Sequence, residues 1–218
     1  MFTDPGGRAM RQSDASYFSL HRLESLTDGI YAIAMTLLVL SLPLPQVNGT
    51  SVDNDILAHL GKHANLFGSY ALSFMLLGSF WVVQLKIFKY IKSSCVPHIW
   101  GNLIGLLVVC LIPFTSSMMG YHNHTFTANL MFHMNILLVS LLFIYQGAIL
   151  LKYPEIIADG HDIASVKRII RINMVLPFVS VSGIAVSFFS PEFSTLVYIS
   201  VPLMVNRLRT KLHGGSDL

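Results

Sequence analysis

The sequence has few charged residues and only two cysteines, and both shortages limit the class of protein. Charged residues make up 11% of the chain, whereas a soluble globular domain usually has about a quarter. The apolar fraction is 53% and the mean hydropathy is +0.62. Cys95 falls in a predicted loop and Cys110 in the middle of a predicted helix, about 20 Å away, so no internal disulfide is expected. These features predict a membrane protein.

Apolar runs of about 20 residues, long enough to cross the hydrocarbon core as a helix, occur six times. A transmembrane β-barrel needs apolar and polar residues in alternation, which stretches such as NLIGLLVVCLIPF lack. The fold class is therefore predicted as all-α, a polytopic membrane protein with six transmembrane helices. The predicted spans are Leu23–Leu44, Asn65–Ile87, Ile99–Met119, Ala128–Leu151, Ile169–Phe189 and Phe193–Asn206.

Lysine and arginine are almost absent from one side of the predicted bundle. Thirteen of the fourteen fall in the tails or in the loops after the second and fourth spans, and only Lys62 lies on the opposite side. Short cytoplasmic loops retain such residues, so both termini are predicted to be cytoplasmic and no nucleic-acid partner is needed. The predicted organisation is a tail at 1–21, a membrane domain at 22–207 and a tail at 208–218. The N-terminal tail has no apolar stretch, so no cleavable signal is expected.

The middles of the predicted spans contain almost no titratable side chain. His133 is the exception, and the other deep polar residues are small or neutral. Proton-coupled carriers usually have carboxylates near the midplane, and an enzyme needs a convergent nucleophile, base or metal set. No GxSxG, HExxH or paired midplane acids occur. We therefore expect neither an enzyme nor a cofactor.

Two pairs of histidines lie outside the predicted spans. His59 and His63 have an i, i+4 spacing suited to a metal ion, but no third ligand is near, so a solvated helix face is favoured. His122 and His124 fit either a sensor of external pH or an exposed loop. The sequence leaves this second choice open.

Several residues predict irregular helices. Pro113, Pro177 and Pro202 are expected to kink the third, fifth and sixth spans, since proline removes a backbone donor. Gly101-x-x-x-Gly105 permits close approach of a neighbouring helix. The second helix is expected to begin early, because DNDILAHLGKHANL is compatible with a helix and opens with good N-terminal residues.

Charged residues gather where the first span begins, in RLESLTDGIYAIAMTLLVL at residues 22–40. At about 100° per residue, Ile33, Leu37 and Leu40 form one stripe with Thr36 beside it. Asp28 lies roughly 140° away from that stripe. The charged entry and the apolar stripe therefore face different neighbours. The pattern alone favours ordinary lipid or helix packing for the stripe.

The run R-x-x-x-L-T-D-G at residues 22–29 resembles the R-x-x-x-F-S-D signature of the TMEM175 potassium channel family. Phe80-Trp81, the KIFKYIK segment and NLIGLLVVCLIPF extend the resemblance over the first three spans. The remaining spans match only in hydropathy and order. The resemblance implies a prokaryotic member with one six-helix repeat per chain, assembled as a homotetramer in which the first helix of each subunit lines a central pore.

The resemblance also implies roles for individual residues. Ile33 would form the hydrophobic constriction, Leu37 and Leu40 further rings, and Thr36 a polar contact for ions. A packing network would hold the first helix in place, and its implied members are Arg22, Thr27, Asp28, Trp81 and Asn102. Gln84-Leu85 stands where family members often have a histidine pair, so the network of this chain differs from theirs at this position.

The implied function is a potassium-preferring cation channel in the cell membrane. No TVGYG-type loop is present, so ions would pass an apolar neck that gates by dewetting, with a modest preference for potassium over sodium. The expected partners are further copies of the chain, membrane lipid, and potassium or other monovalent cations as permeant species. Two alternatives stay open: a secondary transporter or proton leak pathway of the same topology, and a non-conducting membrane scaffold.

Overall fold

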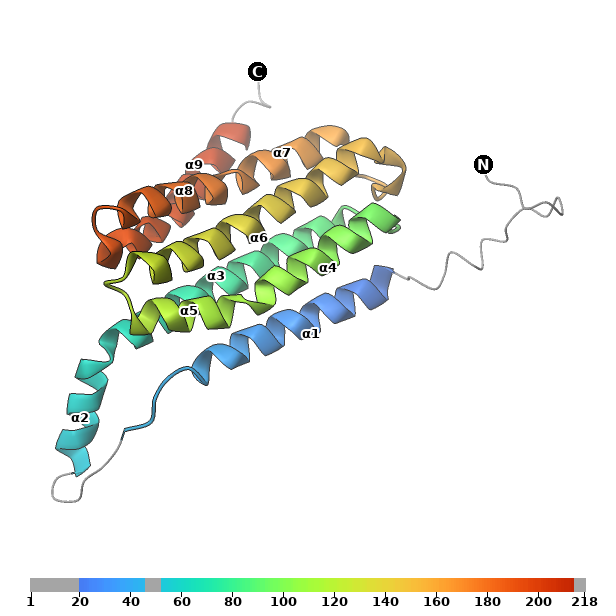
Figure 1. Cartoon of the computed structure of the whole chain (residues 1–218). Helices are drawn as coiled ribbons and strands as arrows, with labels where there is room; N and C mark the ends of the chain where they lie inside the picture. The colour runs from blue at the N-terminus through green and yellow to red at the C-terminus, as the bar shows by residue number, and fades with distance from the viewer. Residues whose placement is uncertain (1–19, 46–51, 214–218) are drawn as a thin grey trace, which may run out of the picture.

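The chain forms a bundle of helices that lie side by side, with α1 at one edge and α7, α8 and α9 at the other (Figure 1). The computed structural model describes residues 20–45 and 52–213, with side chains as far as Leu208. In this part of the chain the elements are α1 (Leu20–Val39), α2 (Val52–Lys62), α3 (Ala64–Lys89), α4 (Val96–Cys110), α5 (Ile112–Tyr121), α6 (Phe126–Lys152), η2 (Pro154–Ile156), α7 (Ile163–Asn173), α8 (Val175–Ser187), η3 (Pro191–Ile199) and α9 (Ser200–His213). The predicted all-α class is confirmed.

Four segments are long and apolar enough to cross a membrane, namely Ala64–Lys89, Val96–Tyr121, Phe126–Lys152 and Ile163–Ser187. They correspond to the second to fifth predicted spans. α1 is also 20 residues long, but it has Arg22, Glu24 and Asp28 in its first three turns. The last predicted span is divided between the 3-10 helix η3 and α9. Most of the predicted tails, residues 1–19 and 214–218, lie outside the described residues.

Two predicted boundaries were wrong. α1 ends at Val39 and not at Leu44, because Pro43 cannot donate to the helix and its ring clashes with the preceding turn. α7 begins at Ile163, six residues before the predicted start, because the carboxylate of Asp162 accepts a hydrogen bond from the Ser165 amide at 2.9 Å and caps the helix. Because α7 contains charged residues, the apolar run in the sequence begins later than the helix itself.

The three prolines lie next to the breaks that divide the longer spans. Pro113 follows the α4–α5 break at Leu111, and Pro177 follows the α7–α8 break at Met174. Pro202 comes three residues after η3 ends at Ile199. Proline forces such breaks because it lacks an amide hydrogen and crowds the carbonyl four residues before it. The predicted irregularities are confirmed.

The break between α4 and α5 is bridged by a side chain from α6. The carboxamide of Asn135, in the orientation that satisfies both of its polar atoms, donates to the Val108 carbonyl at 3.0 Å and accepts from the Ile112 amide at 3.1 Å. Backbone groups freed by a proline need such partners, because lipid cannot supply them. Asn135 therefore supplies hydrogen bonds to backbone groups at the break between α4 and α5.

The small-residue motif of α4 faces α6. A Cβ atom on Gly101 would lie 2.9 Å from the Tyr145 ring, and one on Gly105 would lie 3.7 Å from Nε2 of Gln146. A distance under 3.0 Å leaves no room for a methyl group without movement of the ring. The close approach of two helices that the motif predicts is confirmed.

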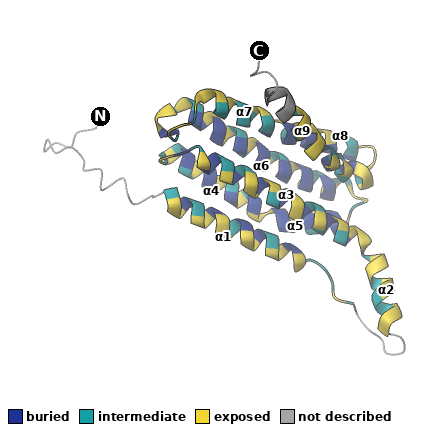
Figure 2. Cartoon of the chain, turned by 180° about the vertical axis from the view of Figure 1, so that it is seen from behind, coloured by how far each residue is buried: buried dark blue, intermediate teal, exposed yellow. Residues whose placement is uncertain are grey.

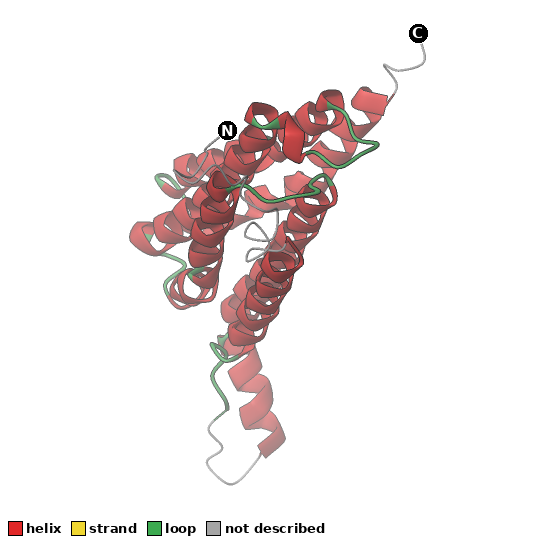
Figure 3. Ribbon diagram, turned by 90° about the vertical axis from the view of Figure 1, so that its right-hand side faces the viewer, coloured by secondary structure: helices red, strands yellow, loops and turns green. Residues whose placement is uncertain are grey.

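The second helix does begin early, but as a separate element. α2 has no buried residue and continues beyond the end of the bundle (Figure 3), where most of its surface is exposed (Figure 2). A junction at His63 separates it from α3. The expected early turns therefore form α2, outside the packed helices.

Positive side chains gather at one end of the bundle. α3 and α6 end at Lys89 and Lys152, and Arg168 lies in the middle of α7. The loops at this end are joined by an isolated bridge between Ile91 and Ile157. We call this the basic end, and α1 and α4 begin there.

Candidate functional site

Four buried polar side chains join α1 to the helices behind it. Nδ2 of Asn102 on α4 donates to the Thr27 hydroxyl on α1 at 2.9 Å. Nε2 of Gln84 on α3 donates both to Oδ1 of Asn102 at 3.0 Å and to Oε1 of Gln146 on α6 at 3.1 Å. We call Thr27, Asn102, Gln84 and Gln146 the polar chain. Each of the four is at most 2% exposed, so the hydrogen bonds between them are shielded from bulk water.

From Gln84 to α1, the hydrogen bonds of the polar chain share one direction. Gln84 donates to Asn102, Asn102 donates to Thr27, and the Thr27 hydroxyl donates to the Leu23 carbonyl at 2.7 Å. Such a series strengthens each bond in a low-dielectric interior, and it makes any unpaired member costly. The polar chain therefore specifies both the position and the rotation of α1.

A second contact holds α1 at Asp28, the residue after Thr27. Nε1 of Trp81 on α3 donates to Oδ1 of Asp28 at 2.8 Å. Both residues are exposed, so this contact is open to its surroundings in a way that the polar chain is not. Of the predicted network, the structure thus brings together Thr27 with Asn102 and Asp28 with Trp81. Arg22 is exposed, and none of the hydrogen bonds described for the chain includes it.

The opposite side of α1 is apolar and uncovered. Ile33 is 59% exposed, Leu37 45%, and Leu40, in the turn directly after α1, 76%, and these three residues form what we call the apolar stripe. Thr36 beside it is exposed, and its hydroxyl donates to the Ile33 carbonyl at 2.8 Å. The buried face of α1 consists of Leu23, Thr27, Tyr31, Ala34 and Leu38. In a single chain, nothing among the described residues covers the stripe.

Sequence reasoning missed Gln84 as a member of the network, and it missed Gln146 altogether. Their signal was the presence of a large amide in an otherwise apolar span, which usually marks a packed network or a pathway. Gln84 occupies the position where the resemblance led us to look for a histidine. The two amides border a cavity of about 10 Å³, close to the volume that a single water requires.

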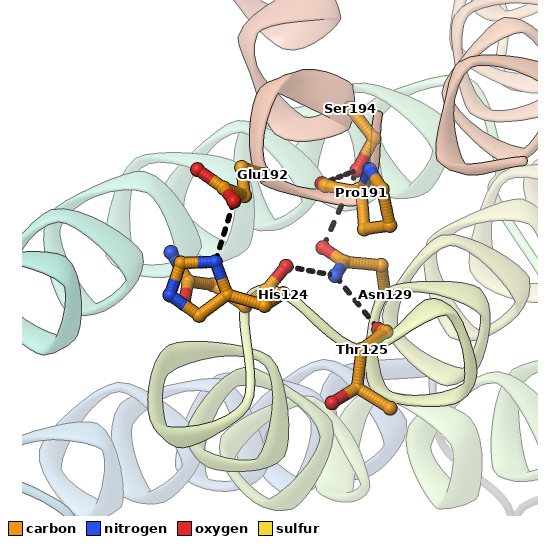
Figure 4. Close-up of polar contacts among 7 residues, drawn as sticks. His124, Thr125, Asn129, Pro191, Glu192 and Ser194 are labelled. Carbon is orange, nitrogen blue, oxygen red and sulfur yellow. Dashed lines mark hydrogen bonds and ion pairs between the residues drawn. The ribbon is translucent and has the colours of Figure 1, made fainter. Parts of the chain in front are cut away.

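A separate set of polar contacts joins the loop before α6 to η3 at the end opposite the basic end (Figure 4). Nδ2 of Asn129 donates to the Thr125 carbonyl at 3.0 Å, and the Ser194 hydroxyl donates to Oδ1 of Asn129 at 3.3 Å. Nδ1 of His124 lies 2.5 Å from Oε1 of Glu192. These contacts fix the start of η3 against α6.

Close to these contacts, a buried histidine holds α6 to α8 and η3. Nδ1 of His133 lies 2.9 Å from the Tyr198 hydroxyl, and Nε2 lies 3.0 Å from the Ser194 hydroxyl. A Cβ atom on Gly183 of α8 would lie 2.6 Å from the His133 ring. His133, the exception noted among the deep polar residues, is therefore part of a packed network.

The histidines with metal-ligand spacing contact carbonyl oxygens. Nε2 of His59 lies 2.9 Å from the Pro43 carbonyl, and Nδ1 of His63 lies 2.9 Å from the His59 carbonyl. Within the described ranges no group of three or more His, Cys, Asp or Glu side chains is arranged to hold a metal ion.

The fold and the site together define a polytopic helical membrane protein. Its first helix is held on one face by buried polar side chains and presents an uncovered apolar stripe on the other. Residues 22–113 match the model of the family described as endosomal/lysosomal potassium channel TMEM175. This region contains α1 from Arg22 onward, its contacts with Asn102 and Trp81, and the apolar stripe. Over residues 22–113, which are fewer than half of the chain, the sequence is similar to the TMEM175 family.

Individual relatives match about half of this chain. A potassium channel of Streptomyces collinus is 31% identical over 98 residues, which is 45% of this chain and 46% of that protein. The endosomal/lysosomal proton channel TMEM175 of Gallus gallus is 30% identical over 101 residues, 44% of this chain and 19% of that protein. The match thus spans about half or less of the length of these curated relatives.

The fold resembles one solved structure over nearly its full length. The crystal structure of a lysosomal potassium-selective channel TMEM175 homologue from Chamaesiphon minutus superposes with a TM-score of 0.71 and 20% sequence identity. The superposition covers 92% of this chain and 99% of that one. The likeness extends to the helices after residue 113, where the family model does not match.

Proposed function

We propose that this chain is one subunit of a cation channel and that α1 of each subunit lines the pore. The observation that carries the proposal is the asymmetry of α1. Its polar chain fixes one face within the subunit, while the opposite face, with Ile33, Leu37 and Leu40, is apolar and exposed. The names of the relatives, potassium channel and proton channel, support the same function class.

A channel of this kind needs several copies of the chain. A single α1 cannot enclose a pore. If several copies met around a common axis, the apolar stripe would be partly buried between subunits. We infer four copies from the family resemblance, with both termini on the cytoplasmic side and the basic end facing the cytoplasm. No cofactor is needed, and potassium is the proposed permeant ion.

The apolar stripe supplies a constriction without ion ligands. A ring of Ile33 side chains would be dry when narrow and would pass partly hydrated ions when the helices move apart. Potassium sheds its hydration water more readily than sodium does, so an apolar neck favours potassium, and the preference should be modest. Leu37 and Leu40 would extend the neck, and Thr36 would offer a hydroxyl oxygen at its wall.

The test is a reversal potential measured on the purified chain in planar bilayers under a potassium/sodium gradient. Wild type, Ile33→Asn and Leu37→Asn are compared. Leu138→Asn on α6 is the matched control, because Leu138 has the same 45% exposed fraction as Leu37. We expect a potassium-directed potential in wild type, changed selectivity or open probability in both α1 variants, and wild-type behaviour in the control.

Other outcomes identify the alternatives. A potential that follows the proton gradient in place of the potassium gradient would favour the proton leak pathway. Saturable, coupled flux would favour a transporter. If correctly assembled wild-type protein gives no current, the result would favour a non-conducting membrane scaffold. Equal effects of Leu37→Asn and Leu138→Asn would show that α1 does not line the pore.

A further inference from the structure

A groove of about 770 Å³ lies between α3 and the last helices of the bundle. It is bounded by α3, α7, α8 and α9, and its volume lies in the range of ligand-binding pockets. Apolar side chains form most of its wall, among them Val82, Leu176 and Val205. Two of the bounding segments, α3 and the α7–α8 pair, are long and apolar enough to cross a membrane. The groove therefore lies at the depth of lipid.

One end of the groove is positively charged. Lys86 and Lys89 line it from α3, and Arg168 lines it from α7. All of the lining residues are described, and none of them is acidic. The charge lies at the basic end, where the lipid headgroups would be. The groove thus combines cations at headgroup depth with an apolar wall at acyl-chain depth.

A buried amide supplies the polar contact between these two zones. Asn173 lines the groove and is only 8% exposed, and its Nδ2 has no hydrogen-bond partner. It lies five residues after Arg168, about 7.5 Å further along the helix axis. A buried amide donor without a partner costs free energy, and a ligand oxygen at this position would remove the cost.

We propose that this groove binds one molecule of an anionic phospholipid. Its phosphate would contact Lys89 and Arg168, with Lys86 nearby, and an ester carbonyl one and a half helical turns deeper would accept from Asn173. Its acyl chains would lie along α3, α8 and α9. Basic pockets between membrane helices on the side of the headgroups suit anionic lipid. A second copy of the chain would have to bring carboxylates to the same cations, whereas a phospholipid supplies phosphate and apolar chains in one molecule. The proposal does not depend on ion conduction.

Native mass spectrometry of the full chain in detergent, with phosphatidylglycerol or phosphatidylcholine added, tests the proposal. We expect one phosphatidylglycerol per subunit, bound about tenfold more tightly than phosphatidylcholine, because the site contains several cations. Lys89→Gln and Arg168→Gln should each weaken phosphatidylglycerol binding about fivefold. Asn173→Leu should weaken the binding of both lipids. Lys152→Gln removes a cation from the same end but outside the groove, and should bind like wild type.

Further experiments distinguish a bound lipid from a free phosphate compound, from general surface charge and from a subunit interface. Inorganic phosphate and glycerol 3-phosphate, which lack acyl chains, should not compete at millimolar concentration. Competition by either would mean a phosphate site and not a lipid site. If Lys152→Gln weakens binding as much as Lys89→Gln, the attraction is general surface charge and the proposal fails. If the groove variants dissociate the oligomer while the lipid preference stays unchanged, the groove is a subunit interface and the proposal is overturned.

Discussion

Nδ2 of Asn102 donates a hydrogen bond to the Thr27 hydroxyl at 2.9 Å, and both side chains are about 1% exposed. The bond joins positions 75 residues apart in the sequence. Because both groups are shielded from bulk water, this contact favours the face of α1 that contains Thr27 turning inward. Every proposal about the apolar stripe on the other face depends on it.

Thr27→Val tests that contact, since valine keeps the shape of threonine and removes the hydroxyl. The Asn102 amide would lose an acceptor in a buried place, so we expect a loss of about 1–2 kcal/mol in the free energy of unfolding. Thermal unfolding in detergent measures it. Thr36→Val on the exposed face is the control, and it should lower the free energy of unfolding only slightly. Equal losses for the two variants would show that the polar chain is not what holds α1.

Trp81→Phe tests the second contact of α1, between the indole N–H and Asp28. Both residues are exposed, so we expect a smaller loss than for Thr27→Val, at most about 1 kcal/mol. A double-mutant cycle with Asp28→Asn, read by thermal unfolding, isolates the coupling. A coupling larger than the whole effect of Thr27→Val would reverse the ranking of the two contacts.

Gly183→Ala tests the packing of α8 against the His133 ring. The added methyl group would lie 2.6 Å from the ring, so the helices must move apart, at a cost of about 1–3 kcal/mol. Gly68→Ala on α3 is the matched control, because nothing lies within 4 Å of its new Cβ. That change should stabilise the chain by up to about 1 kcal/mol, since alanine is the better helix former. Stabilisation by both changes would contradict the close packing.

The cap of α7 predicts a dependence on pH. Hydrogen bonds from Ser165 hold the pKa of Asp162 below its ordinary value of about 3.9. A lowered pKa in the folded state means that the contribution to stability is present above about pH 4 and is lost as the pH falls through the folded value. Asp162→Asn keeps a cap acceptor but does not titrate.

Melting temperatures of wild type and Asp162→Asn between pH 3 and pH 6 check this expectation. The wild type should lose stability relative to the variant below about pH 4, and the difference between the two should be constant above it. A difference that stays constant over the whole range would mean that Asp162 is not the group responsible.

Local features of the sequence determined the helices. Six apolar runs, three prolines and the Gly101-x-x-x-Gly105 motif predicted the class, the breaks and one close packing contact, because each depends on nearby residues and the 3.6-residue period. The family signature at Arg22–Gly29 directed attention to α1. The errors fell at helix ends, where Pro43 and the Asp162 cap outweighed hydropathy.

Only the tertiary structure decided which polar residues meet. Gln84 and Gln146 are 62 positions apart, and no local pattern pairs them, because an amide in an apolar span has many candidate partners. The same holds for the groove, where Lys89 comes from α3 while Arg168 and Asn173 come from α7, far later in the chain. Hydrophobic periodicity specifies that a helix forms and which residues share its face. Long-range packing then decides which helix that face meets, and therefore which side of α1 is left uncovered.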